Sequence, residues 1–129
     1  MTDHGKLPSP RFNVGIDCED IARWRKMLPK IEAGVQKKLF SAGEHRYCRS
    51  YKDPAPHYAV RWCAKEALLK ACSPFYKLDL RKIEVANAED GSPFIILNDP
   101  EAESLNLTVK VSMSHSKETA IAIVAVAKL

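Results

Sequence analysis

The chain has 129 residues and a formal net charge of +4, with 20 lysines and arginines against 16 aspartates and glutamates. This length suits a single domain with one hydrophobic core, and no apolar run is long enough to cross a membrane. Aromatic residues make up only 8% of the chain and no nucleic-acid-binding module is recognisable, so a nucleic-acid partner is not favoured.

The first residues, 1–11, are polar and proline-containing, unlike a secretory signal. We expect them to form a flexible leader before one domain over residues 12–129. The cysteines lie at positions 18, 48, 63 and 72 and form no Cys-x-x-Cys pair, so a zinc site is not predicted. Free cysteines of this kind favour a reducing, cytoplasmic compartment.

A strand is predicted over Phe12–Ile16, followed by a helix that begins near Cys18 or Glu19. Asp17 then lies at the junction, where an aspartate can cap the helix. Asp17, Glu19 and Asp20 also place three carboxylates within four residues. That density of oxygen ligands suits a divalent cation such as Mg²⁺.

Helices are predicted over Ile21–Lys30 and Ile31–Phe40, interrupted at Pro29. Ser41–Pro56 is expected to be mostly loop, with a short helix near Glu44–Tyr47. The first helical region is basic, with cations at Arg23, Arg25, Lys26, Lys30, Lys37 and Lys38. A basic surface of this kind binds an acidic partner, either a protein or nucleic acid.

The next helix is predicted over about His57–Cys72 and stops before Pro74. Glu66 and Lys70 lie four residues apart and therefore share one face. Such a pair is either a solvated ion pair contributing about 0.2–0.5 kcal/mol, or a metal ligand beside a phosphate-binding cation. Lys65 precedes Glu66 and points about 100° around the helix.

The rest of the chain has strand patterns. Arg81–Asn87 and Phe94–Leu97 should form one hairpin, and Leu105–Met113 and Thr119–Ala127 a second. The last strand is apolar on both faces, so it is covered on both sides or buried in an oligomer. The predicted class is α+β: an N-terminal strand and helices followed by an antiparallel sheet.

Three segments, in this order and spacing, resemble the phosphopantetheinyl transferases and specifically the small holo-acyl-carrier-protein synthases. They are Gly15-Ile16-Asp17 with Arg23 six residues later, Ala64-Lys65-Glu66-Ala67-Leu68-Leu69-Lys70, and Ser114-His115-Ser116. The strand before Gly91-Ser92-Pro93 agrees as well, so the resemblance covers nearly the whole chain from about Phe12.

The resemblance implies an enzyme that transfers the 4′-phosphopantetheine group of coenzyme A to a serine of an apo acyl carrier protein and releases 3′,5′-ADP. It implies Mg²⁺ held by Asp17 and Glu66, with Lys70 neutralising phosphate charge. His115 is expected to hydrogen-bond a coenzyme A phosphate, and Lys65 to reach another phosphate or a subunit boundary. A homotrimer with active sites between subunits is also implied.

Glu19 matches a third metal-binding carboxylate of the larger, two-lobed members, so we expect it to contact the metal directly or through water. Arg23 matches a residue that docks the acidic carrier protein, and Arg25 and Lys26 are added to that surface from charge alone. The general base is either Glu66 or a water near Asp17.

One departure is the turn Ser73-Pro74-Phe75, which stands where small members have a glycine-rich turn against coenzyme A. Proline removes an amide donor there. Alternative functions are a Mg²⁺-dependent coenzyme A or nucleotide pyrophosphate hydrolase, a non-catalytic binding module for coenzyme A or a carrier protein, and a basic nucleic-acid-binding domain. The kind of carrier protein, from fatty-acid or polyketide synthesis, stays open.

Overall fold

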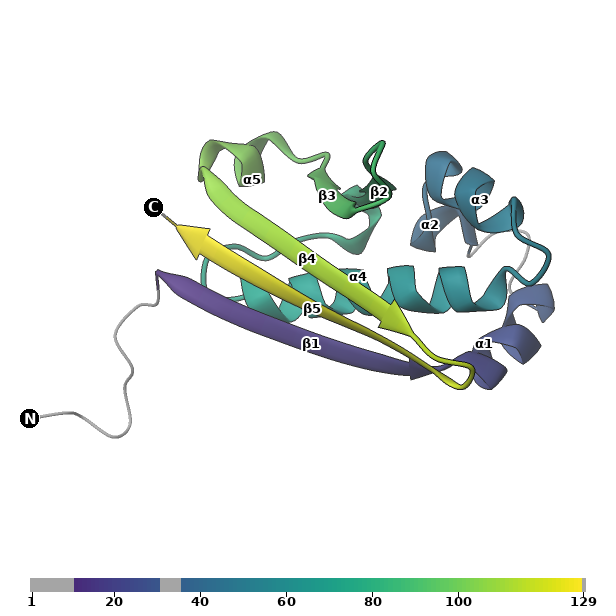
Figure 1. Ribbon diagram of the computed structural model, residues 1–129. Helices are drawn as coiled ribbons and strands as arrows, with labels where there is room; N and C mark the ends of the chain where they lie inside the picture. Colours follow the sequence, from purple (N-terminus) through teal and green to yellow (C-terminus); the bar gives the residue numbers. More distant parts are fainter. Residues whose placement is uncertain (1–10, 31–35, 129) are drawn as a thin grey trace, which may run out of the picture.

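A computed structural model describes residues 11–30 and 36–128. In chain order the elements are β1 (Phe12–Asp20), α1 (Ile21–Met27) with a 3-10 turn (Leu28–Lys30), α2 (Gln36–Leu39), α3 (Ala42–Arg49), α4 (Ala55–Cys72), a second 3-10 turn (Leu80–Lys82), β2 (Ile83–Asn87), β3 (Pro93–Leu97), α5 (Pro100–Ser104), β4 (Leu107–His115) and β5 (Thr119–Lys128). The predicted α+β order, with a strand and helices before the antiparallel strands, is confirmed (Figure 1). Except for Arg11, the predicted leader lies outside the described residues, as do residues 31–35.

The main sheet has three antiparallel strands in the order β1-β5-β4, and β2 pairs with β3 in a separate hairpin. Strand β1 is longer than predicted, because its pairing with β5 continues from Phe12 opposite Ala127 to Asp20 opposite Thr119. The helix begins at Ile21, and Asp20 is its N-cap, accepting a hydrogen bond from the Ala22 amide at 3.1 Å.

The predicted helix start near Cys18 or Glu19 is therefore wrong, and Asp17 is a strand residue opposite Ala122. Because side chains alternate along a strand, Asp17 and Glu19 share the inner face of β1 with Gly15. The sequence pattern misplaced this boundary because an aspartate at position 17 or 20 serves equally well as a cap.

Helix α4 packs across the inner face of the sheet, over β1 and β5 (Figure 1). The inner side chains of β5 are small and fully or almost fully buried: Ala120, Ala122, Val124 and Val126. At β1 the approach is closest at Gly15, where an added Cβ would lie 2.0 Å from the Ala67 carbonyl oxygen. Glycine at this position thus lets β1 and its carboxylates lie directly against α4.

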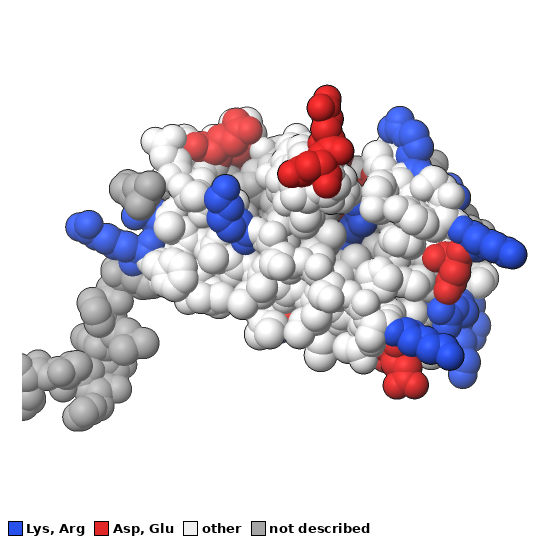
Figure 2. Space-filling model, viewed as in Figure 1, with Lys and Arg blue, Asp and Glu red and all other residues white. Residues whose placement is uncertain are grey.

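The outer face of β1 and β5 is apolar and open in the single chain, whereas the exposed side chains of β4 are polar: Thr108, Lys110, Ser112 and Ser114. The large exposed side chains of the apolar part are Phe12, Val14, Ile16, Ile121 and Ile123. Figure 2 shows that the face turned to the viewer, formed by the strands, is largely free of charged side chains. The prediction that β5 is apolar on both faces is confirmed; α4 covers one face only.

The segment after Phe40 is more helical than predicted. Ser41 and Glu44 form a capping box: the Glu44 amide donates to the Ser41 hydroxyl at 3.1 Å, and the Ser41 amide donates to Glu44 Oε1 at 2.8 Å. This Ser-x-x-Glu pattern starts α3, which is longer than the short helix expected near Glu44–Tyr47. In the described residues no helix is both long and apolar enough to cross a membrane.

Candidate active site

Three of the predicted site residues lie together where β1 crosses α4. Lys70 Nζ donates to the Ile16 carbonyl oxygen at 2.9 Å and to Asp17 Oδ1 at 3.3 Å. Glu66 stands one turn before Lys70 on α4, on the face turned toward β1. The structure therefore brings Asp17, Glu66 and Lys70 into one cluster, open to solvent on the Lys70 side.

Electrostatics within this cluster suit a cation. Burial raises the pKa of Glu66, the nearby Asp17 carboxylate raises it further, Lys70 lowers it, and Glu19 adds a smaller increase. Repulsion between oxygen ligands is what a bound divalent ion relieves. Magnesium is usually held by one or two carboxylates with substrate phosphates completing its shell. The donor set of Asp17 and Glu66 therefore fits Mg²⁺.

Glu19 adds negative charge beside these two carboxylates, and its expected contact with the metal, direct or through water, stays a prediction. Glu19 lies on the inner face of β1, two residues beyond Asp17, and is half-buried. Within residues 11–30 and 36–128, no three His, Cys, Asp or Glu side chains are grouped so as to hold a metal ion. The structure thus does not assemble Glu19 with Asp17 and Glu66 into the three-carboxylate set that we expected.

Lys65 lies apart from this cluster, inside the protein. Its side chain is 1% exposed, and its ammonium donates to Glu44 Oε1 at 2.6 Å and to the Leu39 carbonyl oxygen at 2.7 Å. The other Glu44 oxygen accepts the Val85 amide at 2.9 Å. This arrangement joins α2, α3, α4 and β2, and leaves Lys65 no open path to a phosphate in this conformation.

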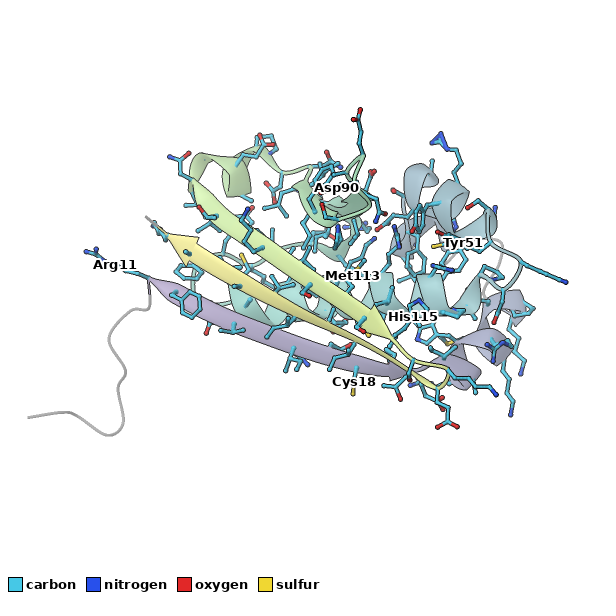
Figure 3. The ribbon with its side chains drawn as sticks, viewed as in Figure 1. Arg11, Cys18, Tyr51, Asp90, Met113 and His115 are labelled. Carbon is cyan, nitrogen blue, oxygen red and sulfur yellow. The ribbon has the colours of Figure 1, made fainter. Side chains whose placement is uncertain are left out.

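His115 is on the other side of α4 from the carboxylates. It ends β4, where its ring lies edge-on to His57 with centroids 5.6 Å apart (Figure 3). His57 and Glu66 are nine residues apart, and at 100° per residue they face opposite sides of the helix. One chain therefore presents two separate polar regions: Asp17–Glu66–Lys70 beside β1, and His115 with His57 beside β4.

A cavity that we did not predict from the sequence adjoins the His115 side. Its volume is about 420 Å³, and it is lined by Gly43, Arg46, Tyr47, Ser50, Arg61, Glu84, Val85, Ala86 and Asn87. Arg61 is 1% exposed; one guanidinium nitrogen donates to Asn87 Oδ1, and Nε has no hydrogen-bond partner. A buried arginine that lacks part of its hydrogen bonding is suited to an anionic ligand.

The signal for this cavity in the sequence was weak. Arg61 stands four residues before Lys65 on a helix that was expected to bury mostly apolar residues, so its position alone does not distinguish a ligand from a surface charge. The guanidinium lies over the Tyr47 ring at 3.9 Å from the centroid. Only the packing of α3 and β2 against α4 shows that Arg61 is enclosed.

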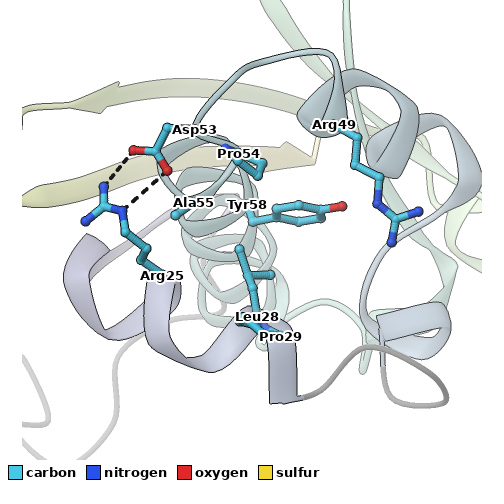
Figure 4. Close-up of a pocket in the computed structure, with 8 residues that line it drawn as sticks. All are labelled: Arg25, Leu28, Pro29, Arg49, Asp53, Pro54, Ala55 and Tyr58. Carbon is cyan, nitrogen blue, oxygen red and sulfur yellow. Dashed lines mark hydrogen bonds and ion pairs between the residues drawn. The ribbon is translucent and has the colours of Figure 1, made fainter.

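The predicted docking residues of α1 divide into two groups. Arg23 and Lys26 are exposed and line a hollow of about 410 Å³ with Met27 and Lys30. Arg25 instead forms an ion pair with Asp53 at 2.7 Å, at the rim of a cavity of about 450 Å³ (Figure 4). That contact raises the pKa of Arg25 and lowers the pKa of Asp53. Basic side chains gather at this end of the molecule in Figure 2.

The turn after α4 is closed by its own hydrogen bonds. The amides of Phe75 and Tyr76 both donate to the Cys72 carbonyl oxygen, at 2.8 and 3.0 Å, and the Ser73 hydroxyl donates to the Lys70 carbonyl oxygen at 3.0 Å. These amides are therefore already used within the chain. The departure from a glycine-rich turn removes backbone donors that a ligand could otherwise use.

Comparison with known proteins gives the class that this fold and site define. Residues 13–124 match the 4′-phosphopantetheinyl transferase superfamily, and the chain belongs to that superfamily. Its curated relatives include holo-[acyl-carrier-protein] synthases from Thermodesulfovibrio yellowstonii, 35% identical over 88% of this chain and 96% of the relative. A second, from Syntrophus aciditrophicus, is 40% identical over 86% of this chain and 91% of the relative.

Solved structures agree with this assignment. An acyl carrier protein synthase from Mycobacterium tuberculosis superimposes with a TM-score of 0.71 at 34% identity, covering 91% of this chain and 97% of the other. A Chronobacterium ammoniagenes ACPS–CoA complex superimposes with a TM-score of 0.77 at 26% identity, covering 92% and 98%. The predicted family and fold are confirmed.

Proposed function

We propose that this protein is a holo-[acyl-carrier-protein] synthase, which transfers 4′-phosphopantetheine from coenzyme A to a serine of an apo acyl carrier protein. The observation that carries the proposal is the cluster of Asp17, Glu66 and Lys70 at the crossing of β1 and α4, in a chain of this superfamily. Its relatives carry that name and are known in complexes with coenzyme A.

In the proposed reaction the serine oxygen of the carrier protein bonds to the β-phosphorus of coenzyme A, and the phosphoanhydride bond to 3′,5′-ADP breaks. Asp17 and Glu66 would hold Mg²⁺, and the bound ion would neutralise charge on the pyrophosphate. The Lys70 ammonium, 55% exposed at its side chain, adds a second positive charge for the phosphates. The serine proton goes to Glu66 or to a water near Asp17.

The nucleotide half of coenzyme A is assigned to the other side of α4. The cavity is lined by Arg46, by Glu84 and by Arg61, which is 1% exposed, and its Tyr47 ring lies 5.9 Å from the His57 ring, which in turn contacts His115. Arg46, Tyr47 and His115 thus offer hydrogen-bond donors and aromatic rings on this side of α4, which suit a phosphorylated nucleoside. Lys65 is left out of the phosphate-binding set because its ammonium is enclosed with Glu44.

The two halves of this site lie on opposite sides of α4, so the proposal includes a homotrimer with each active site formed between two subunits. The apolar outer face of β1 and β5, with Phe12, Ile16 and Ile123 exposed, supports burial against other copies of the chain. If so, mixing Asp17→Ala with His115→Ala, each impaired on its own, restores part of the transfer activity, since one interface of a mixed trimer carries both native halves. A mixture no more active than the separate variants would contradict shared sites.

The carrier protein is proposed to dock on α1. Arg23 and Lys26 are exposed beside the half-buried Met27, in a hollow that Lys30 and Asp20 also line. Three cations and one carboxylate thus adjoin an apolar contact, which suits an acidic protein helix. A cytoplasmic location is proposed as well, supported by four cysteines without a disulfide, three of them buried.

The deciding experiment is intact-mass spectrometry of an apo acyl carrier protein incubated with this protein, coenzyme A and Mg²⁺, with and without EDTA. We expect a mass gain of one phosphopantetheine group that EDTA abolishes. Asp17→Ala should lose most of this gain while keeping the thermal unfolding transition of the wild type.

Other outcomes select the alternatives. Consumption of coenzyme A with no mass gain on any carrier would indicate a pyrophosphate hydrolase. Binding of coenzyme A with neither transfer nor hydrolysis would indicate a binding module. A mass gain that persists in Asp17→Ala would contradict the assignment of the site.

A further inference from the structure

His57, to which the family resemblance gives no role, is packed among aromatic rings on several sides. It occupies the first turn of α4, and the Tyr51 ring stacks on it with centroids 3.6 Å apart and an interplanar angle of 19°. The rings of Tyr47 and His115 meet it edge-on, at 5.9 and 5.6 Å, each with an angle of 77°. His57 therefore joins the cavity side, through Tyr47, to the exposed imidazole of His115.

The surroundings of His57 disfavour a positive charge on its ring. Burial lowers the pKa of His57, His115 and Arg61 lower it further, and only Asp53 acts in the opposite direction. The remaining titratable neighbours are the phenols of Tyr47 and Tyr51, which are neutral near pH 7. The first turn of a helix also disfavours a cation. A neutral His57 therefore meets the neighbouring rings as an uncharged aromatic group.

We propose that His57 is a positioning residue for coenzyme A binding: held by the Tyr51 stack, it fixes the ring of His115 so that an N–H of His115 faces a phosphate of the nucleotide. This inference rests on the proposed function. It extends the site to two residues, His57 and Tyr51, that do not themselves touch the phosphate.

The competing explanation is that His57 only packs the start of α4. Both explanations predict some loss of stability when His57 is removed, so stability does not separate them. They differ in whether the effect of His57 on ligand binding passes through His115. A double-mutant cycle measures this dependence directly.

The probe is 3′,5′-ADP, titrated calorimetrically into folded wild type, His57→Ala, His115→Ala and the double variant. His57→Ala should weaken binding about 3- to 10-fold, the range of a lost aromatic pair, and His115→Ala about 10- to 100-fold, as a lost hydrogen bond to a charged group. In the His115→Ala background, removal of His57 should change the affinity less than about twofold, because the residue that it positions is gone.

Matched variants separate the ring contacts from the hydroxyl groups. Tyr51→Phe keeps the stack and loses only the hydroxyl that lies 3.2 Å from the Tyr47 hydroxyl, so its affinity should match the wild type. Tyr51→Ala should weaken binding like His57→Ala. In proton NMR, His115→Phe should raise the apparent pKa of His57, because His115 is one of the groups that lower it.

The results also distinguish this inference from the proposed function. A wild-type protein that neither binds 3′,5′-ADP nor transfers phosphopantetheine refutes the proposed function. A wild type that does both, with His57→Ala binding 3′,5′-ADP as tightly as the wild type, refutes the positioning role alone. Equal effects of His57→Ala with and without His115 would refute it too, since His57 would then act independently.

Discussion

Replacing Gly15 with alanine changes the closest contact between β1 and α4. The new methyl carbon would lie 2.0 Å from the Ala67 carbonyl oxygen and 2.8 Å from the Ala71 backbone nitrogen. Ordinary contact begins at 3.4 Å, so relieving the contact with the oxygen requires about 1.4 Å of separation, the difference between the two distances. Both obstacles are backbone atoms of a helix, which cannot rotate away as a side chain can.

This separation has two measurable consequences. Overpacking of a core contact costs about 1–3 kcal/mol, and we expect the upper part of that range for Gly15→Ala. Asp17 lies two residues further along the same strand, so its carboxylate moves away from Glu66 and Lys70. Because a misplacement of about 1 Å can lower a rate about 100-fold, transfer activity should fall more than the loss of folded protein explains.

Urea unfolding gives the free energy of unfolding, and the transfer rate is then measured where the variant is folded. Gly43→Ala is the control for stability: its added Cβ would lie 3.1 Å from Glu84 Oε2, the end of a flexible side chain, and alanine favours the helix α3. That variant should be as stable as the wild type or more so. Wild-type stability to within about 0.5 kcal/mol together with full activity in Gly15→Ala would refute the close-approach argument.

Three further predictions follow from the contacts described. Lys65→Met leaves the Glu44 carboxylate buried without its cation, so it should lower the free energy of unfolding in urea by about 3–5 kcal/mol. The double variant with Glu44→Gln should recover part of that loss. A single variant as stable as the wild type would contradict the buried pair. Arg23→Glu should raise the KM for the carrier protein about tenfold or more, with little change in coenzyme A affinity. Arg25→Glu should have a smaller effect, because Arg25 is already paired with Asp53 at the surface. Equal losses would contradict this division of α1. The pKa of Glu66 is raised in the folded protein, so its contribution to stability is present below the ordinary carboxyl pKa and is lost as the pH rises through the raised value. Without Mg²⁺, the variant Glu66→Gln should therefore be more stable than the wild type at about pH 7 and equal to it below about pH 4. No gain in stability at neutral pH would contradict the raised pKa.

The part of the site that could be predicted is the part that local spacing determines. Glu66 and Lys70 share a helix face at any packing, and the hairpin of β4 and β5 was predicted from two neighbouring strand patterns, Leu105–Met113 and Thr119–Ala127. Asp17 was assigned to the same cluster by resemblance, and the structure places it there although the strand boundary was predicted wrongly. Asp17 faces inward because side chains alternate along the strand, not because it caps a helix.

The part that could not be predicted depends on contacts between distant segments. Lys65 was expected to reach a phosphate or a subunit boundary, but it is enclosed by the Glu44 carboxylate, 21 residues earlier in the chain. The only local sign was the capping-box pattern beginning at Ser41, which identifies a helix start but not that the same Glu44 oxygen also accepts a hydrogen bond from Lys65. The same holds for Arg61, whose enclosure requires β2 and α3 to pack against α4.

Helix α4 is the element from which both halves of the proposed site are built, and its geometry keeps the two halves apart within one chain. Glu66 and His57 face opposite sides of it. Asp17 and His115 stand on β1 and β4, two strands that are separated by β5 and therefore lie roughly 10 Å apart, at two strand spacings. Helix α4 packs over β1 and β5 on the inner face of the sheet. In the proposed homotrimer, a second copy of the chain would bring its His115 side to the Asp17 side of the first, so that one coenzyme A molecule meets both.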